Sequence, residues 1–383
     1  MVPDPWNASQ PPRKETLRIE YIPRPGLLSM CFVNFLLGLL TLSIYRFWAR
    51  TNVRKHIWSC VHINGEPLEY TGRGIELFKG ALFVFVVFGL PAVLLIAGIS
   101  IAYGPEHPAI GAVQTLFLFI VSLLWGAAVF RARRYQLSRT QWRGIRGWLE
   151  GSATTYSLLY FGSLLARGMT LGWITPVMSI NLQEKMLGGM RFGSMPFRFK
   201  GRAGPLYPPY AISWFLTFAV FIGIAIAVGA AIAFLAGDDL SAALGDFFAE
   251  KDQPTEEQAF KIGVFFAGIA AFYLLLFLFY PIVWSIYAAR EMAVLAGYTS
   301  IGDARFRLRT TTGSMIGLTI GNILIWVFTL GIGGPYVNQR LVRYLCDRME
   351  IDGKVDVDNI RQSTAPLSTM GEGLADALDV GGL

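Results

Sequence analysis

The sequence predicts an all-α membrane protein, a polytopic helical bundle with three repeated units and two transmembrane hairpins. Three observations point to this fold class. Apolar residues make up 54% of the 383 residues and charged residues only 15%, whereas a soluble domain usually carries about 25% charge. Four apolar runs are long enough to cross a bilayer, which takes about 20 residues. A motif that starts with Thr-Leu occurs three times, which indicates internal repetition.

The long apolar runs cover residues 81–103, 110–130, 211–236 and 262–289. They pair as two hairpins, at residues 79–132 and 208–291. The connection at residues 104–109 has no Lys or Arg, and the connection at 237–258 has seven carboxylates and one lysine. Because basic residues concentrate in cytoplasmic loops, we expect both connections outside and the basic loops in the cytoplasm.

The net charge of +7 does not indicate a nucleic-acid-binding protein, because the basic residues cluster beside the apolar runs. The three cysteines are isolated and suggest no disulfide framework. We expect a polar N-terminal segment at 1–26 without a secretory signal, a membrane domain at 27–348 and a mobile polar tail at 349–383.

Three shorter apolar segments, at residues 27–48, 157–182 and 315–337, have basic residues on both flanks. Full crossings would place one basic flank of each segment outside. Either the positive-inside rule has exceptions here, or the segments enter and leave on the cytoplasmic face as re-entrant or broken helices. They belong to repeat units near 27–78, 153–202 and 313–348.

The repeated motif begins at Thr41, Thr170 and Thr329 and contains residues that interrupt helices. Glycine adopts backbone angles that other residues resist, and proline lacks a backbone N–H. The candidate helix breaks are Gly172, Pro176, Gly331, Gly333, Gly334 and Pro335. The first copy has Ser43 and Phe47 at the corresponding places. A helix that simply ends at the membrane interface is the alternative explanation.

Four polar residues interrupt or adjoin these apolar segments: Asn34, Arg167, Asn181 and Asn322. A charge at membrane depth faces a cavity or partner, or extends to the headgroups from a shallow helix, and Arg167 fits either arrangement. The asparagines either hydrogen-bond neighbouring helices or contact a substrate.

The Thr-Leu motif, the basic stretch Arg54-Lys55-His56-Ile57-Trp58 and residues 140–146 resemble the YjgN-like family of bacterial inner-membrane proteins. The resemblance covers residues 27–348, although the first motif departs from the family at Ser43 and Phe47. It implies a multi-pass location in the bacterial inner membrane. It brings no established chemistry and no catalytic residues.

No nucleotide-binding, serine-hydrolase or metalloprotease motif is present in the sequence, so we expect no enzyme and no catalytic, cofactor or metal residues. Two functions fit. A transporter- or channel-like protein would use Asn34, Arg167, Asn322 and the last break to line a path. A protein that organises lipid or a partner would bind anionic headgroups through basic residues. The candidates for headgroup contact are Arg50, Arg54, Lys55, Arg133, Arg134, Arg340 and Arg343.

Overall fold

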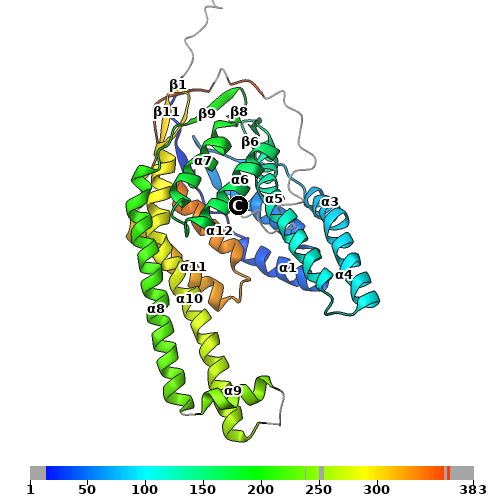
Figure 1. Cartoon of the computed structure of the whole chain (residues 1–383). Coiled ribbons are helices and arrows are strands. Elements are labelled where there is room, and N and C mark those ends of the chain that lie inside the picture. The colour runs from blue at the N-terminus through cyan, green and yellow to red at the C-terminus, as the bar shows by residue number, and fades with distance from the viewer. Residues whose placement is uncertain (1–13, 238, 250–253, 358–359, 363–383) are drawn as a thin grey trace, which may run out of the picture. The chain divides into compact units, whose positions relative to one another are not determined.

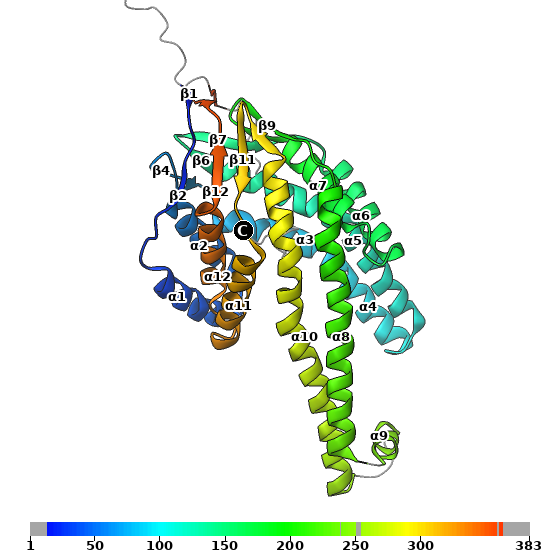
Figure 2. The same cartoon turned by 90° about the vertical axis from the view of Figure 1, so that its left-hand side faces the viewer.

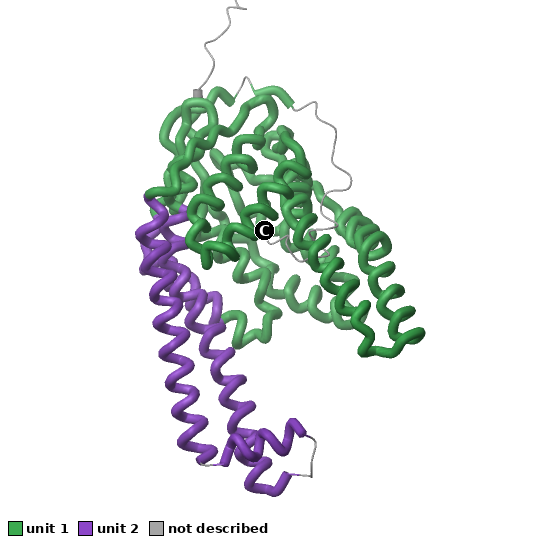
Figure 3. The backbone as a smooth tube through the Cα atoms, viewed as in Figure 1, with its two compact units in different colours: residues 1–204, 293–309, 325–383 green, residues 205–292, 310–324 purple. Residues whose placement is uncertain are grey.

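The computed structural model describes residues 14–237, 239–249, 254–357 and 360–362. The chain forms two compact units, which are coloured separately in Figure 3. Within the described residues, the first unit comprises the chain up to residue 204 together with 293–309 and 325–362, and the second comprises 205–292 and 310–324. Helices make up 69% of the residues and strands 12%.

The first unit contains most of the helices (Figure 1). They are α1 (Leu27–Leu40), α2 (Arg46–Cys60), α3 (Gly74–Val84), a π-helical turn (Phe85–Gly89), α4 (Leu90–Tyr103), α5 (Pro108–Arg139), α6 (Ala153–Met169), α7 (Thr175–Gly188) and α12 (Gly334–Cys346). The 3₁₀ turn Gly204–Leu206 leads into α8 (Tyr207–Ala236), which is followed by α9 (Leu240–Phe248), α10 (Glu256–Gly297) and α11 (Thr312–Phe328). The division between the units falls within α10 and α11.

Among the described residues, four continuous helical segments are long and apolar enough to cross a membrane. They are Gly74–Tyr103, Pro108–Arg139, Gly204–Ala236 and Glu256–Gly297. They contain the four predicted apolar runs, and large apolar side chains such as Leu94, Leu118 and Phe221 are exposed along them. The prediction of four apolar membrane-spanning segments is therefore confirmed.

The all-α prediction is wrong because the polar stretches between the helices form β-sheets. The strands are β1 (Lys14–Glu15), β2 (Ile19–Tyr21), β3 (Val61–Ile63), β4 (Glu66–Pro67), β5 (Glu69–Tyr70), β6 (Thr140–Trp142), β7 (Ile145–Leu149), β8 (Met190–Phe192), β9 (Met195–Phe199), β10 (Thr299–Ile301), β11 (Ala304–Leu308), β12 (Met349–Asp352) and β13 (Val355–Asp356). Eight of them, β5 to β12, pair in sequence order, β2, β3 and β4 form a second sheet, and β1 pairs with β13. Short strands joined by two-residue turns such as Asn64-Gly65 and Arg143-Gly144, which have positive φ, account for the difference.

Tight turns alternate with helical insertions along the antiparallel meander. Two-residue turns join β6 to β7, β8 to β9 and β10 to β11, whereas helices connect β5 to β6, β7 to β8, β9 to β10 and β11 to β12. Strands on either side of an insertion are paired, as in Leu149 with Met190 and Leu308 with Met349. Because neighbouring strands run in opposite directions, every helical insertion leaves from and returns to the same end of the strands. The α1–α2 insertion between paired β2 and β3 follows the same rule.

The largest of the apolar clusters given for the first unit lies among its strands. Trp142, Ile301, Ala304, Ile351 and Val355 are buried in it. Partly buried side chains from β2, β3, β8 and β9 pack against the same cluster. Strands from both ends of the chain therefore share one core, and Figure 2 shows β2 and β12 side by side.

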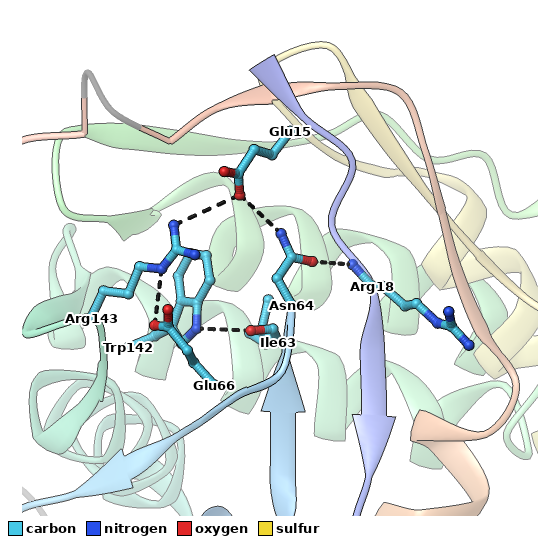
Figure 4. Close-up of polar contacts among 7 residues, drawn as sticks. All are labelled: Glu15, Arg18, Ile63, Asn64, Glu66, Trp142 and Arg143. Atoms are coloured by element: carbon cyan, nitrogen blue, oxygen red, sulfur yellow. Dashed lines mark hydrogen bonds and ion pairs between the residues drawn. The ribbon is translucent and has the colours of Figure 1, made fainter. Parts of the chain in front are cut away.

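Polar contacts tie the N-terminal strand to the first two hairpin turns (Figure 4). Asn64 accepts a hydrogen bond from the backbone N–H of Arg18 at 2.7 Å and donates to Glu15 at 3.1 Å. Arg143 pairs with Glu66 at 2.9 Å, and the Trp142 indole donates to the Ile63 carbonyl at 3.2 Å. These contacts hold the β3–β4 and β6–β7 turns together.

The predicted mobile tail at 349–383 needs correction at its start. Residues 349–352 form β12, which pairs with β11, and Ile351 and Val355 are buried in the sheet core. Alternating apolar side chains let this polar-looking stretch add an edge strand. Residues 363–383 lie outside the described residues.

In the second unit, α8 and α10 pack against each other. The Ser213 hydroxyl donates to the Val283 carbonyl at 3.3 Å. The Tyr210 ring contacts Trp284 and Tyr287 edge-on, with ring centroids 5.6 and 5.3 Å away. This aromatic cluster fixes the register of the hairpin.

Candidate functional site

Five-residue turns join α1 to α2, α6 to α7 and α11 to α12, and each begins with the threonine of the repeated motif. The N–H of the third turn residue donates to the carbonyl five residues earlier: Ser43 to Gly38 at 2.7 Å, Gly172 to Arg167 at 2.7 Å and Gly331 to Trp326 at 3.0 Å. Leu42, Leu171 and Leu330 have φ of 49°, 50° and 49°. This is a Schellman helix ending in which leucine occupies the left-handed position that glycine usually takes.

The threonine hydroxyl serves the backbone on both sides of each turn. Thr41 and Thr329 donate to the carbonyls of Leu37 and Ile325 at 2.7 and 2.6 Å. The same hydroxyls accept from the N–H groups of Tyr45 and Gly333 at 2.9 Å. Thr170 makes the corresponding contacts with Ala166 and Ile174. The hydroxyl therefore gives an acceptor to an N–H group just past the interruption, which matters most away from water, and adds a second donor to a carbonyl that already accepts the threonine N–H.

The candidate break residues lie in or just after these turns. Gly172 and Gly331 have φ of 89° and 85° within them. Pro176 and Pro335 each occupy the second position of the following helix, α7 or α12, where a missing N–H costs nothing. Gly333 precedes α12 and Gly334 begins it. The prolines thus start the second helix of each pair. Sequence reasoning missed the roles of the threonine hydroxyl and the left-handed leucine.

A cavity of about 520 Å³ lies in the first unit. It is lined by α1, by α2, by the end of α11 with the turn that follows it, and by α12. Arg46, Arg50 and Arg54 line it at four-residue spacing, which places them on one face of α2. None of its described lining residues is Asp or Glu. The remaining lining residues are Cys31, Asn34, Phe35, Gly38, Ser43, Ala49, Val53, Trp326, Ile332, Pro335 and Asn338.

The innermost arginine is held firmly. Arg54 is 4% exposed, donates to the Tyr70 hydroxyl at 3.1 Å and lies over the Tyr70 ring at 5.5 Å from its centroid. Arg46, at the other end of the row, lies 5.0 Å from the centroid of the Phe47 ring. The row therefore runs from a buried guanidinium to an exposed one.

Asn34 faces this cavity from α1, and its buried Nδ2 has no acceptor within the described part of the chain. A buried donor without a partner costs about 1–3 kcal/mol. Phe35, Trp326 and Ile332 give the cavity apolar walls opposite its polar groups. The cavity is amphipathic, with guanidinium and amide donors beside hydrocarbon.

Helix α12 is anchored near the cavity by a buried contact. Gln339 donates to the Tyr21 hydroxyl of β2 at 2.8 Å. Burial, together with a hydrogen bond to Cys60, raises the pKa of the Tyr21 phenol well above its ordinary value. The hydrogen bond from Gln339 holds α12 beside β2.

The structure separates the predicted polar residues. Asn34 lines the cavity, whereas Arg167 and Asn181 are exposed and do not contribute to it. Asn322 belongs to the second unit, and its buried Oδ1 has no donor among the described residues. The four residues do not form one path within the first unit.

The basic candidates also separate into groups. Arg50 and Arg54 line the cavity, whereas Arg133 is exposed on α5. Arg134 donates to the Leu149 carbonyl at 2.9 Å and so ties α5 to β7. Arg343 pairs with Asp347 at 3.5 Å. Arg340 is half-buried on α12, and Lys55 is exposed on α2. Arg46 and Asn338 were missed, although the four-residue spacing of Arg46, Arg50 and Arg54 was visible in the sequence.

Comparison with known proteins identifies relatives of this chain. The family described as bacterial protein of unknown function, DUF898, matches residues 25–377. The inner membrane protein YjgN of Salmonella typhimurium is 23% identical over 375 residues, which cover 88% of this chain and 89% of that protein. YjgN of Escherichia coli O157:H7 is 30% identical over 117 residues, 30% of this chain and 27% of that protein. No solved structure matches.

The resemblance to YjgN-like inner-membrane proteins is thus confirmed over most of the chain. The four apolar helices agree with the location that the relatives' names give. The chain belongs to the bacterial family of unknown function DUF898.

Proposed function

We propose that the protein binds an anionic, phosphate-bearing lipid in the α1–α2–α12 cavity and thereby organises lipid at the cytoplasmic face of the bacterial inner membrane. The observation that supports this most is the row Arg46, Arg50 and Arg54 in a cavity whose lining has no carboxylate and is otherwise largely apolar. Guanidinium groups bind phosphate through paired N–H donors, and the apolar walls suit an acyl chain. Asn34 adds a donor for which the described residues provide no acceptor.

The three Thr-Leu helix pairs act as copies of one re-entrant unit in this proposal. Their turns share the same hydrogen bonds, and the segments 22–60, 150–189 and 309–348 have nearly equal length. Helix α1 is about 21 Å long at 1.5 Å per residue, which is short of the roughly 30 Å hydrocarbon core. Leu42, Leu171 and Leu330 at the tips are 89%, 74% and 90% exposed, as suits contact with lipid tails.

The basic clusters, and the fact that all insertions leave from one end of the strands, support a location of the sheet on the cytoplasmic side. The connections at 104–109 and 237–258 then lie outside. Cysteines at two exposed positions, Glu66 and Arg198, test this orientation in a variant without native cysteines. We expect an impermeant reagent to label them only in inverted vesicles. Labelling of either position in intact cells refutes the orientation.

Lipid binding is tested by native mass spectrometry of the purified chain with phosphatidylglycerol and, separately, phosphatidylcholine. We expect phosphatidylglycerol to bind in preference, and Arg50→Ala to weaken its binding by about tenfold, since a charged hydrogen bond contributes about 1.5–3 kcal/mol. Arg290→Ala removes an exposed arginine of α10 from outside the cavity lining and serves as the matched control. Equal binding of both lipids, or equal losses in both variants, contradicts the proposal.

A transporter- or channel-like function is the second candidate, because Asn34 and Pro335 of the expected path line the same cavity. Flux of anionic solutes in proteoliposomes that depends on Asn34 and Arg50 would favour it. Lipid binding by itself requires no catalytic step and no cofactor, in keeping with a sequence that carries no catalytic motif.

A further inference from the structure

A second cavity, of about 400 Å³, lies in the first unit where α3 begins beside the sheet. It shares no lining residue with the α1–α2–α12 cavity. Its lining is polar and comes from three separate stretches of the chain. The lining residues are Thr71, Arg73, Glu76, Arg139, Gln141, Arg146 and Gln362.

The charge of this lining is unbalanced. Glu76 is its one carboxylate among the described residues, against Arg73, Arg139 and Arg146. Both Glu76 oxygens already accept hydrogen bonds, one from Arg139 at 2.9 Å and the other from the Tyr135 hydroxyl. The described lining of this cavity therefore carries more positive than negative charge.

Arg139 supplies a donor that lacks a partner. Its Nη2 is occupied by Glu76, whereas its Nε is buried and has no acceptor within the described part of the chain. A guanidinium held in place by one carboxylate can present its remaining N–H groups to a second oxyanion. The side chain is 12% exposed, so such a ligand would reach it through the cavity.

The start of α3 also favours an anion in this cavity. Arg73 precedes this helix, and no side chain caps its first turn. Uncapped N–H groups and the helix dipole favour an anion at this end. Gly74 fixes the position, because a Cβ there would lie 2.8 Å from the Trp48 backbone of α2.

We propose that this cavity binds a phosphate group, either as inorganic phosphate or as the headgroup of a phosphatidic acid. Arg73, Arg139, Arg146 and the first turn of α3 supply the donors. Gln362 lies over the site, where it accepts from the Arg146 N–H at 3.0 Å and donates to the Gly144 carbonyl at 2.7 Å. The polar lining distinguishes the site from the lipid cavity.

Calorimetry of the full chain in detergent, titrated with inorganic phosphate at constant ionic strength, tests this site. We expect saturable binding that Arg73→Ala and Arg146→Ala each weaken by tenfold or more. Arg198→Ala, which removes an exposed arginine of β9, serves as the control and should leave binding unchanged. Nanodiscs with and without phosphatidic acid form the second arm of the experiment.

Binding of free phosphate that depends on Arg73 supports the site with a soluble ligand. Binding of phosphatidic acid but not of free phosphate, if it depends on Arg73, supports the site with a lipid ligand. No binding in either arm, or equal losses in Arg73→Ala and Arg198→Ala, overturns it. Because Arg73 is exposed, its loss should not unfold the chain, and circular dichroism checks this.

Discussion

The α1–α2–α12 cavity and the cavity at the start of α3 each contain three arginines, yet their surroundings differ. The α1–α2–α12 cavity places its arginines beside Phe35, Trp326 and Ile332. The cavity at the start of α3 surrounds its arginines with Thr71, Gln141 and Gln362. Arginine alone therefore does not define the ligand. In the two proposals it is the walls that distinguish a phosphate attached to an acyl chain from a phosphate without one.

The largest expected effect separates the two cavities directly. Replacing both Arg50 and Arg54 with alanine should weaken phosphatidylglycerol binding by about 100-fold, as two charged hydrogen bonds are lost at roughly tenfold each. Binding of inorganic phosphate should stay unchanged. Native mass spectrometry and calorimetry on one preparation measure both quantities. Parallel losses of lipid and phosphate binding would mean that the cavities are not independent.

Asn34→Leu is expected to act on binding and stability in opposite directions. Removal of a buried donor without a partner should raise the free energy of unfolding by about 1 kcal/mol, while lipid binding falls because a donor to the ligand is lost. Denaturant titration and native mass spectrometry measure the two effects.

Asn322→Leu is the matched control for Asn34→Leu, since Asn322 also has a buried atom without a partner and does not line that cavity. It should stabilise the fold without changing lipid binding. Weaker lipid binding in this variant would contradict a local role for Asn34.

The smallest expected effect concerns the turn threonines. Thr41→Val should lower the free energy of unfolding by about 1 kcal/mol, because two backbone groups lose a partner, whereas Thr41→Ser should preserve it. Thr115→Val, which removes a hydroxyl that only donates within α5, is the control and should have little effect. Thermal unfolding in one detergent ranks the three variants, and an equal loss in Thr115→Val would disprove the special role of Thr41.

The sequence predicted the membrane helices well because their signal is local. Twenty apolar residues in a row identify a span without knowledge of any contact. The strands were not predicted, because each has only two to five residues and lies in a polar stretch. Two signals were nevertheless visible: Asn64-Gly65 is a typical hairpin dipeptide, and arginines alternate with apolar residues in 304–308.

The candidate site was only half visible in the sequence. Arg50, Arg54 and Asn34 stood out as polar groups beside apolar runs. That α12 lies against α1 and α2 and completes the cavity is a contact between distant parts of the chain. Periodicity carries no information about such contacts. Arg167 attracted attention because charge is rare at membrane depth, but its exposed position leaves it outside the cavity.

The pairing of β1 with β13 sets the order in which the protein can be completed. Lys14 leaves the ribosome early, and its partner Asp356 is synthesised only after every helical insertion. Contacts so far apart in the chain form late and fold slowly. Closure of the sheet core must therefore wait until all five helical insertions have been synthesised, so strand pairing between the two ends marks a chain that has reached its last strand.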